Sequence, residues 1–120
     1  MDVNLIGCIA EYQFAVEVMS RGFFISFPLL DASPYDCVID TGKGFKKIQI
    51  KSVDKKKDVV RCYIRKSVQK PYSKKDVDYF AIYVKHHKGF YIFKNNGKIK
   101  NITLGKNIHS KDYFNNFVFT

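Results

Sequence analysis

Residues 35–40 and 45–51 are two stretches of β-favouring residues on either side of a glycine-containing break at residues 41–44. This pattern constrains the fold more than any other part of the chain, because it predicts a β-hairpin with a fixed register. If residues 41–44 form the loop, Asp36 lies directly across from Gln49.

The predicted hairpin gathers polar groups on one face. Side chains alternate between the two faces of a strand, so Asp36, Gln49 and Lys51 share one side and Ile48 and Ile50 fill the other. A slip of one residue would move the second strand's set to the opposite face, so this clustering depends on the register.

A carboxylate, an amide and an ammonium group together suit phosphodiester chemistry. A carboxylate beside a main-chain carbonyl holds a hard cation such as Mg²⁺, which also takes phosphate oxygens as ligands. A neighbouring lysine positions or deprotonates the water that attacks the phosphodiester. The hairpin therefore predicts a phosphodiesterase site.

Length and composition favour a folded globule. We expect a single domain over residues 1–120, with 46% hydrophobic residues providing one core. No run of eighteen apolar residues and no signal-peptide pattern occurs in the sequence. We therefore expect a soluble, cytoplasmic protein without a membrane span.

Charge is distributed unevenly along the chain. Residues 1–42 carry a net charge of −5, residues 43–75 of +11 and residues 76–120 of +4. An acidic segment suited to cations is thus followed by a basic one suited to phosphates, which favours nucleic acid as the partner. The alternative is a lysine-rich surface that serves solubility alone.

The basic segment contains a charged turn at residues 54–58, a strand at 59–65 and a proline-containing loop at 66–75. Cations and tyrosines interleave there, as expected for phosphate contacts supplemented by stacking. Lysines at strand edges also deter aggregation, so some of these charges need no ligand. The expected DNA contacts are Ser33, Lys55, Lys56, Lys57, Arg61, Arg65, Lys66, Lys70, Tyr72, Lys74 and Lys75.

Residues 4–21 are predicted to form a helix that ends at Gly22 and is largely buried, because apolar residues cover most of its circumference. Glu17 has polar neighbours one turn away, whereas Glu11 lies on an apolar stripe. Glu11 either reaches water at the edge of the core or points toward the hairpin, where its charge would join that of Asp36.

Further strands are expected at residues 23–28, 79–84 and 89–94, followed by a last strand or short helix in 99–120. The aromatic tail is expected to pack on the sheet or on a partner subunit. Three cysteines in apolar stretches predict buried free thiols without a disulfide scaffold. These are Cys8, Cys37 and Cys62.

Three histidines and an asparagine resemble the His-Asn-His nuclease arrangement: His86, His87, Asn95 and His109. That site needs a ββα unit around its metal, but a strand occupies the middle of this segment. We expect surface histidines instead.

The order of four short motifs resembles the PD-(D/E)xK nuclease superfamily. They are Ala10-Glu11 on the helix, Gly22 after it, Tyr35-Asp36, and Ile48-Gln49-Ile50-Lys51. The chain most resembles a group that includes a cyanobacterial group I intron homing endonuclease, and more distantly the archaeal Holliday junction resolvases. The resemblance implies an α/β, restriction-endonuclease-like core with the N-terminal helix packed on a mixed central β-sheet.

The resemblance also implies roles for individual residues. Asp36 corresponds to the metal-binding aspartate, Lys51 to the catalytic lysine, Gln49 to the (D/E) position and Glu11 to the helix glutamate. Glu11, Asp36 and the carbonyl of Ile50 would hold Mg²⁺, with Mn²⁺ as a substitute. Two positions depart from the pattern: Tyr35 replaces proline, and Gln49 replaces an acid and removes a charge.

The implied function is a metal-dependent DNA endonuclease, either homing-endonuclease-like or junction-resolving. Its substrate would be duplex or branched DNA, and its assembly a homodimer or a dimer of dimers. The alternative is a catalytically inactive, basic nucleic-acid-binding module with a nuclease-like fold, which the neutral Gln49 favours.

Overall fold

The computed structural model describes residues 2–66 and 70–120. The chain begins with helix α1 (Val3–Ser20), where the Asp2 carboxylate accepts hydrogen bonds from two amides of the first turn. At the other end, Gly22 has a φ of +86° and the Phe23 amide donates to the Val18 carbonyl at 3.0 Å. Gly22 therefore ends the helix in a left-handed conformation, as the sequence predicted.

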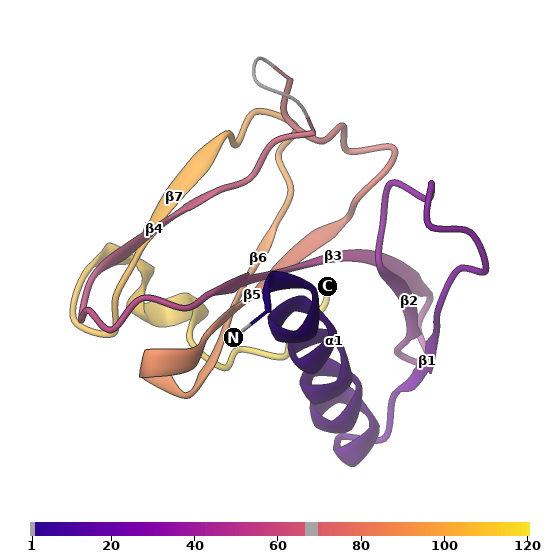
Figure 1. Ribbon diagram of the computed structural model, residues 1–120. Coiled ribbons are helices and arrows are strands. Elements are labelled where there is room, and N and C mark those ends of the chain that lie inside the picture. Colours follow the sequence, from indigo (N-terminus) through magenta and orange to yellow (C-terminus); the bar gives the residue numbers. More distant parts are fainter. Residues whose placement is uncertain (1, 67–69) are drawn as a thin grey trace.

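A five-stranded sheet forms the centre of the molecule, in the order β1-β2-β3-β5-β6 (Figure 1). Strands β3 and β5 are parallel and the other neighbours are antiparallel, so the sheet is mixed. A second sheet pairs β4 with β7. The bounds are β1 (Phe24–Ser26), β2 (Cys37–Asp40), β3 (Phe45–Val53), β4 (Val60–Tyr63), β5 (Tyr79–Val84), β6 (Gly89–Lys94) and β7 (Asn101–Leu104), with 3₁₀ turns η1 (Lys85–His87) and η2 (His109–Tyr113).

The predicted hairpin register is confirmed. Cα partners join Val38 to Lys47 and Asp40 to Phe45, with Cys37 opposite Ile48. Strands β5 and β6 cover the predicted ranges, while β1 is shorter than predicted because only three of its residues pair with β2.

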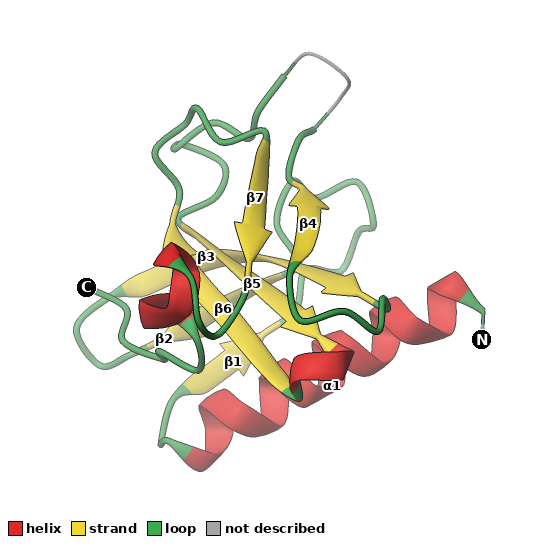
Figure 2. Cartoon of the chain, turned by 90° about the vertical axis from the view of Figure 1, so that its left-hand side faces the viewer, coloured by secondary structure: helices red, strands yellow, loops and turns green. Residues whose placement is uncertain are grey.

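The central sheet is covered on both faces. On one face, Phe14 and Val18 of α1 pack among side chains such as Cys37, Ile48 and Ile50. On the other face, the β4-β7 sheet packs over β5 and β6. Figure 2 shows α1 and the β4-β7 pair at opposite sides of the central strands. The expected α/β core, with the N-terminal helix on a mixed sheet, is confirmed.

The prediction that α1 is largely buried was wrong. Only Ala10, Phe14, Ala15 and Val18 of this helix are buried. The sheet contacts a single stripe of the helix, and the opposite stripe faces solvent although it is also apolar. No helix within residues 2–66 and 70–120 meets the length and hydropathy needed to cross a bilayer.

Two further expectations need correction. Cys8 is exposed because it precedes the part of α1 that the sheet buries, which begins at Ala10, whereas Cys37 and Cys62 are buried as predicted. His87 is buried: Nε2 donates to the Lys57 carbonyl at 2.8 Å, and Nδ1 accepts from the Tyr91 hydroxyl at 2.8 Å. A surface position was expected for it because sequence alone does not reveal its contact with Lys57, thirty positions away, or that Tyr91, four positions away, faces its ring.

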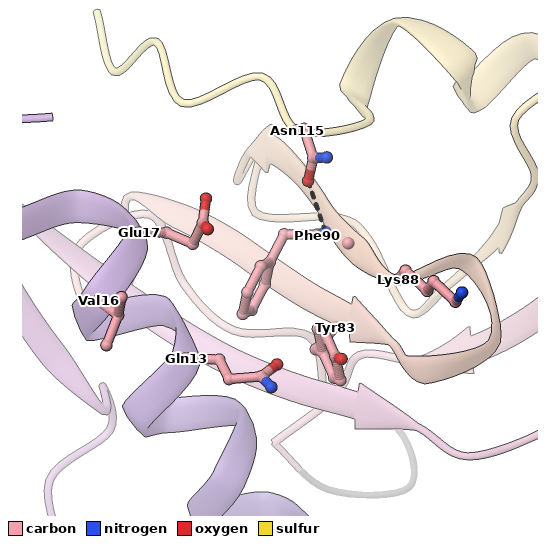
Figure 3. A pocket seen from close by; sticks show the side chains of 8 residues that line it. Gln13, Val16, Glu17, Tyr83, Lys88, Phe90 and Asn115 are labelled. Carbon is pink, nitrogen blue, oxygen red and sulfur yellow. Dashed lines mark hydrogen bonds between the residues drawn. The ribbon is translucent and has the colours of Figure 1, made fainter. Parts of the chain in front are cut away.

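The C-terminal segment contains both a strand and a short helix, and its aromatic tail packs on the sheet. Phe117 and Phe119 surround Phe14, and the hydroxyl of Tyr79 exchanges hydrogen bonds with Thr120 at 2.7 and 2.8 Å. A cleft of about 370 Å³ lies between α1 and β6 (Figure 3). Beside it, the Asn115 side-chain oxygen accepts a hydrogen bond from the Phe90 amide at 3.0 Å.

Candidate active site

Asp36 precedes β2 at the point where its pairing with β3 ends. Its amide donates to the Ile48 carbonyl at 2.8 Å, and its Oδ2 accepts from the Ile50 amide at 2.7 Å. The carboxylate thus accepts the hydrogen bond that a main-chain carbonyl of β2 would accept if the strand continued, and this holds it against β3. Partial burial raises the pKa of Asp36, although the Ile50 hydrogen bond and the charge of Lys51 act in the opposite direction.

Glu11 approaches Asp36 from α1. Burial raises the pKa of Glu11 most, and the negative charges of Asp36 and then Asp31 raise it further. The same two carboxylates, after burial itself, raise the pKa of the Cys37 thiol. The Glu11 and Asp36 carboxylates are therefore close enough for their charges to interact. Glu11 also lines a cleft of about 310 Å³ with Cys8, Tyr12 and Phe27.

Gln49 and Lys51 are half-buried on β3, two residues apart and on the side away from α1. The ammonium of Lys51 lowers the pKa of Asp36 and also acts on Cys62, whose pKa burial raises to about 11. Nζ of Lys51 lies 3.5 Å from the Tyr72 hydroxyl and 5.5 Å from the centroid of its ring. Lys51 is therefore in contact with Tyr72, and its charge also acts on the Asp36 carboxylate.

The segment that carries Tyr72 is fastened to the sheet by residues that sequence reasoning did not assign to the site. The buried Asn95 amide donates to the carbonyls of Tyr72, Ser73 and Val77 at 3.0, 3.1 and 3.0 Å. Asp78 accepts from the Lys47 amide at 2.8 Å and donates its own amide to the Lys47 carbonyl at 2.8 Å.

The family model described as PD-(D/E)XK endonuclease matches residues 1–113. The chain belongs to the PD-(D/E)XK endonuclease family. Among solved structures, the bacterial homing endonuclease I-Ssp6803I is similar, with a TM-score of 0.78 and 23% identity over 95% of this chain and 87% of that one.

The fold of this endonuclease family member also resembles Hjc, a Holliday junction resolvase from the archaeal hyperthermophile Archaeoglobus fulgidus. Here the TM-score is 0.53 and the identity 16%, over 83% of this chain and 88% of that one. No curated protein sequence matches the chain. At these identities, the two structures establish the fold.

The donor set of the endonuclease fold fits a hard divalent cation. PD-(D/E)XK nucleases generally use divalent metals such as Mg²⁺. Glu11 and Asp36 supply two carboxylates that repel each other, and a cation between them would relieve this repulsion. Within residues 2–66 and 70–120 no group of three or more His, Cys, Asp and Glu side chains is arranged as a metal site.

The basic residues expected to contact DNA are mostly exposed. Ser33 is half-buried and accepts from the Tyr35 amide at 3.4 Å, which fits a turn-supporting role. Tyr72 differs from the expectation: its ring is buried 5.8 Å from that of Phe80, so it is closed to stacking on bases. Residues 67–69 of the basic loop lie outside the described residues. The exposed side chains are Lys55, Lys56, Lys57, Arg61, Arg65, Lys66, Lys70, Lys74 and Lys75.

Asp78 and Asn95 are the positions that sequence reasoning missed. Asp78 follows Asp76 and Val77 immediately before β5, and this acidic entry to a strand was the only available signal. Asn95 begins an Asn-Asn-Gly turn that explains its residue type locally, so nothing pointed to its contacts with the Tyr72 segment.

Proposed function

We propose that this protein is a Mg²⁺-dependent DNA endonuclease that hydrolyses phosphodiester bonds. The observation that carries the proposal is the placement of the Asp36 carboxylate, fixed by the Ile50 amide at 2.7 Å and flanked by the charges of Glu11 and Lys51. An anchored acid beside a second acid and a lysine supports metal-assisted phosphodiester hydrolysis, because the acids can bind a metal and the lysine can stabilise developing negative charge.

Each residue has a distinct role in this proposal. Asp36, Glu11 and the carbonyl of Ile50 would hold Mg²⁺, which would supply positive charge beside the scissile phosphate and lower the pKa of a bound water. Lys51, supported by Tyr72, orients the attacking water and stabilises negative charge that develops on the phosphate. The neutral amide of Gln49 orients a water or phosphate oxygen.

Nicking of supercoiled plasmid in the presence of Mg²⁺ or Mn²⁺ tests the proposal. We expect Lys51→Ala and Asp36→Asn to abolish nicking, whereas Lys111→Ala, which removes an exposed lysine outside the site, leaves it unchanged. Asparagine keeps the acceptor for the Ile50 amide, so the loss reports the charge and not the fold. Wild-type protein that fails to nick any DNA with either metal contradicts the proposal.

Metal binding has a readout that is independent of cleavage. Mg²⁺ stabilises whichever state binds it, so it should raise the Tm of the wild-type protein and leave the Tm of Glu11→Gln nearly unchanged. Equal shifts in both proteins would place the metal elsewhere.

The fold resembles both a homing endonuclease and a junction resolvase, and these differ in substrate. We expect cleavage of either a long duplex site or branched DNA, and parallel assays on linear duplex and a four-way junction decide between them. Because one active site cuts one strand, cleavage of both strands calls for a symmetric homo-oligomer.

A second candidate function is a catalytically inactive DNA-binding module, which the replacement of an acid by Gln49 favours. Either way, the lysines of the β3–β4 turn should bind phosphates. Replacing Lys55, Lys56 and Lys57 with alanine should reduce the slope of log affinity against log salt by about 0.9 for each phosphate that is no longer neutralised. The same substitutions at Lys98, Lys106 and Lys111 form the matched control. DNA binding without any nicking, unchanged by Lys51→Ala, would favour the inactive module.

A further inference from the structure

The outer face of α1 carries a continuous apolar stripe that the described part of the chain leaves exposed. Its members recur at alternating intervals of four and three residues, the spacing of a coiled-coil seam. They are Leu5, Ile9, Tyr12, Val16 and Met19, exposed by 51, 37, 68, 60 and 52% respectively. In Figure 1 the view falls directly on α1, and no other segment crosses in front of it.

This stripe lies opposite the one that packs on the sheet. At about 100° per residue, its five members fall within roughly 80° of the helix circumference, centred about 180° from the buried Phe14. A helix that is apolar on two opposite sides normally has a packing partner on each. The sheet is the partner on the inner side only.

We propose that the outer stripe of α1 binds the same stripe of a second copy of this chain, antiparallel and about a two-fold axis near Tyr12. The sequence of the stripe is nearly symmetric about that residue: Leu5 and Met19 each lie seven positions from it, and Ile9 and Val16 lie three and four. An antiparallel copy therefore places Leu5 against the partner's Met19 and Ile9 near the partner's Val16. Such self-complementarity is what a two-fold interface requires.

Charge selects this face for self-association. The whole chain carries +10, so most approaches between two copies are repulsive. Residues 1–20 contain no lysine or arginine, and the flanks of the stripe carry Cys8, Gln13, Ala15 and Ser20. The helix itself therefore brings no basic side chain to the contact, and beside it lie Lys88, which lines a cleft with Val16, and Lys85, which lines a cleft with Ile9.

The size of the contact determines its strength. The 18-residue helix is about 27 Å long, and a single helix face of that length buries well under the about 800 Å² per partner of a stable complex. Phe27, which lines a cleft with Tyr12, widens the apolar surface slightly. We therefore expect a reversible dimer whose population depends on concentration.

The interface would join two active sites through their glutamate-bearing helices. Glu11 is adjacent to Tyr12 and lines the same cleft, so the partner helix would lie beside the acid that approaches Asp36. The use of such a dimer to cut both strands rests on the proposed function, but the dimer itself does not.

Sedimentation velocity without DNA tests the proposal separately from nuclease activity. The wild-type chain should shift from monomer to dimer as concentration rises to about 0.1 mM, in the range of weak reversible complexes. Val16→Lys places two ammonium groups in the apolar contact and should weaken association on the order of a hundredfold. Val118→Lys, at an exposed position outside α1, should leave it unchanged. A wild-type chain that stays monomeric, or a dimer indifferent to Val16→Lys, would overturn the proposal.

Disulfide trapping tests the direction of the helices. In a Cys8→Ser background, Tyr12→Cys should form a cross-linked dimer on oxidation, because the two Tyr12 positions face each other across the axis. Leu5→Cys should not, because antiparallel helices separate the two Leu5 positions by about 21 Å. Circular dichroism confirms that each variant is folded. Efficient cross-linking through Leu5→Cys would indicate parallel helices and overturn the proposed arrangement, whereas failure to nick DNA would leave these results untouched.

Discussion

Asn95 is predicted to hold in place the segment that carries Tyr72, the neighbour of Lys51. Its side-chain amide donates to three carbonyls of the segment that carries Tyr72, and its Oδ1 accepts from the Gly97 amide at 2.9 Å. The Gly97 contact fixes which atom is oxygen, so the nitrogen must face the carbonyls. No other residue type of this size supplies both groups here.

The cost of removing this amide can be worked from these contacts. An amide has two N–H donors, so Asn95→Ala removes two donated hydrogen bonds and one accepted one, each contributing about 1 kcal/mol net. We expect a loss of about 3 kcal/mol of unfolding free energy, a large part of the roughly 5–15 kcal/mol typical of a domain. For a chain of this length, the corresponding fall in Tm is about 10 °C.

Asn95→Asp sharpens the test because it preserves shape and reverses the interaction. A carboxylate oxygen would face three carbonyl oxygens, so this variant should be about 1 kcal/mol less stable than Asn95→Ala at neutral pH. It should recover as pH falls toward about 4, where the acid is protonated and donates. Urea unfolding at pH 7 and pH 4 measures both effects, with exposed Asn96→Asp as the control. An Asn95→Asp variant as stable as the wild type at pH 7 would refute the reasoning.

Three further outcomes are expected. Burial raises the pKa values of both Glu11 and Asp36, and the charge of Asp36 raises that of Glu11 further, so the folded chain binds these protons more tightly and stability falls as pH rises above their ordinary values of 4.5 and 3.8. The stability of Glu11→Gln relative to the wild type should therefore increase as pH rises from those values to 7, as thermal melts across this range will show. A difference in stability between the two proteins that does not change with pH contradicts the coupling. Gly22→Ala should cost about 1 kcal/mol in denaturant unfolding, because alanine is strained at a φ of +86°. Tyr72→Phe keeps the buried ring but removes the hydroxyl near Lys51, so nicking should slow severalfold while stability changes by under about 1 kcal/mol; equal nicking rates would remove Tyr72 from the site.

The hairpin and its register were predictable because strand alternation and a glycine-containing loop are local properties. Once residues 41–44 were assigned to the loop, Cys37 had to face Ile48 and both had to enter the core. The same alternation of side chains predicted that Asp36 and Lys51 share a face. The PD-(D/E)XK family could be recognised from sequence because its motifs follow one another within residues 10–51.

The support around Lys51 could not be predicted, because it depends on contacts between distant segments. Tyr72 and Asn95 are 23 positions apart, and each has an adequate local explanation as a loop or turn residue. The exposure of α1 escaped prediction for a different reason. Apolar residues lie on two opposite sides of this helix, so its pattern does not reveal which side the sheet covers.

If Asp36 has the role proposed for it, the hydrogen bond from the Ile50 amide gives the same carboxylate a structural role as well. A descendant that abandoned cleavage would still need an acceptor at position 36 to finish the β2–β3 edge, so Asp or Asn would persist there for reasons of folding alone. Glu11 has no comparable structural role, since its carboxylate makes no hydrogen bond within residues 2–66 and 70–120. Its charge is repelled by that of Asp36, which lowers stability. Among relatives of this chain, retention of the helix glutamate is therefore the better marker of a working enzyme than retention of the aspartate.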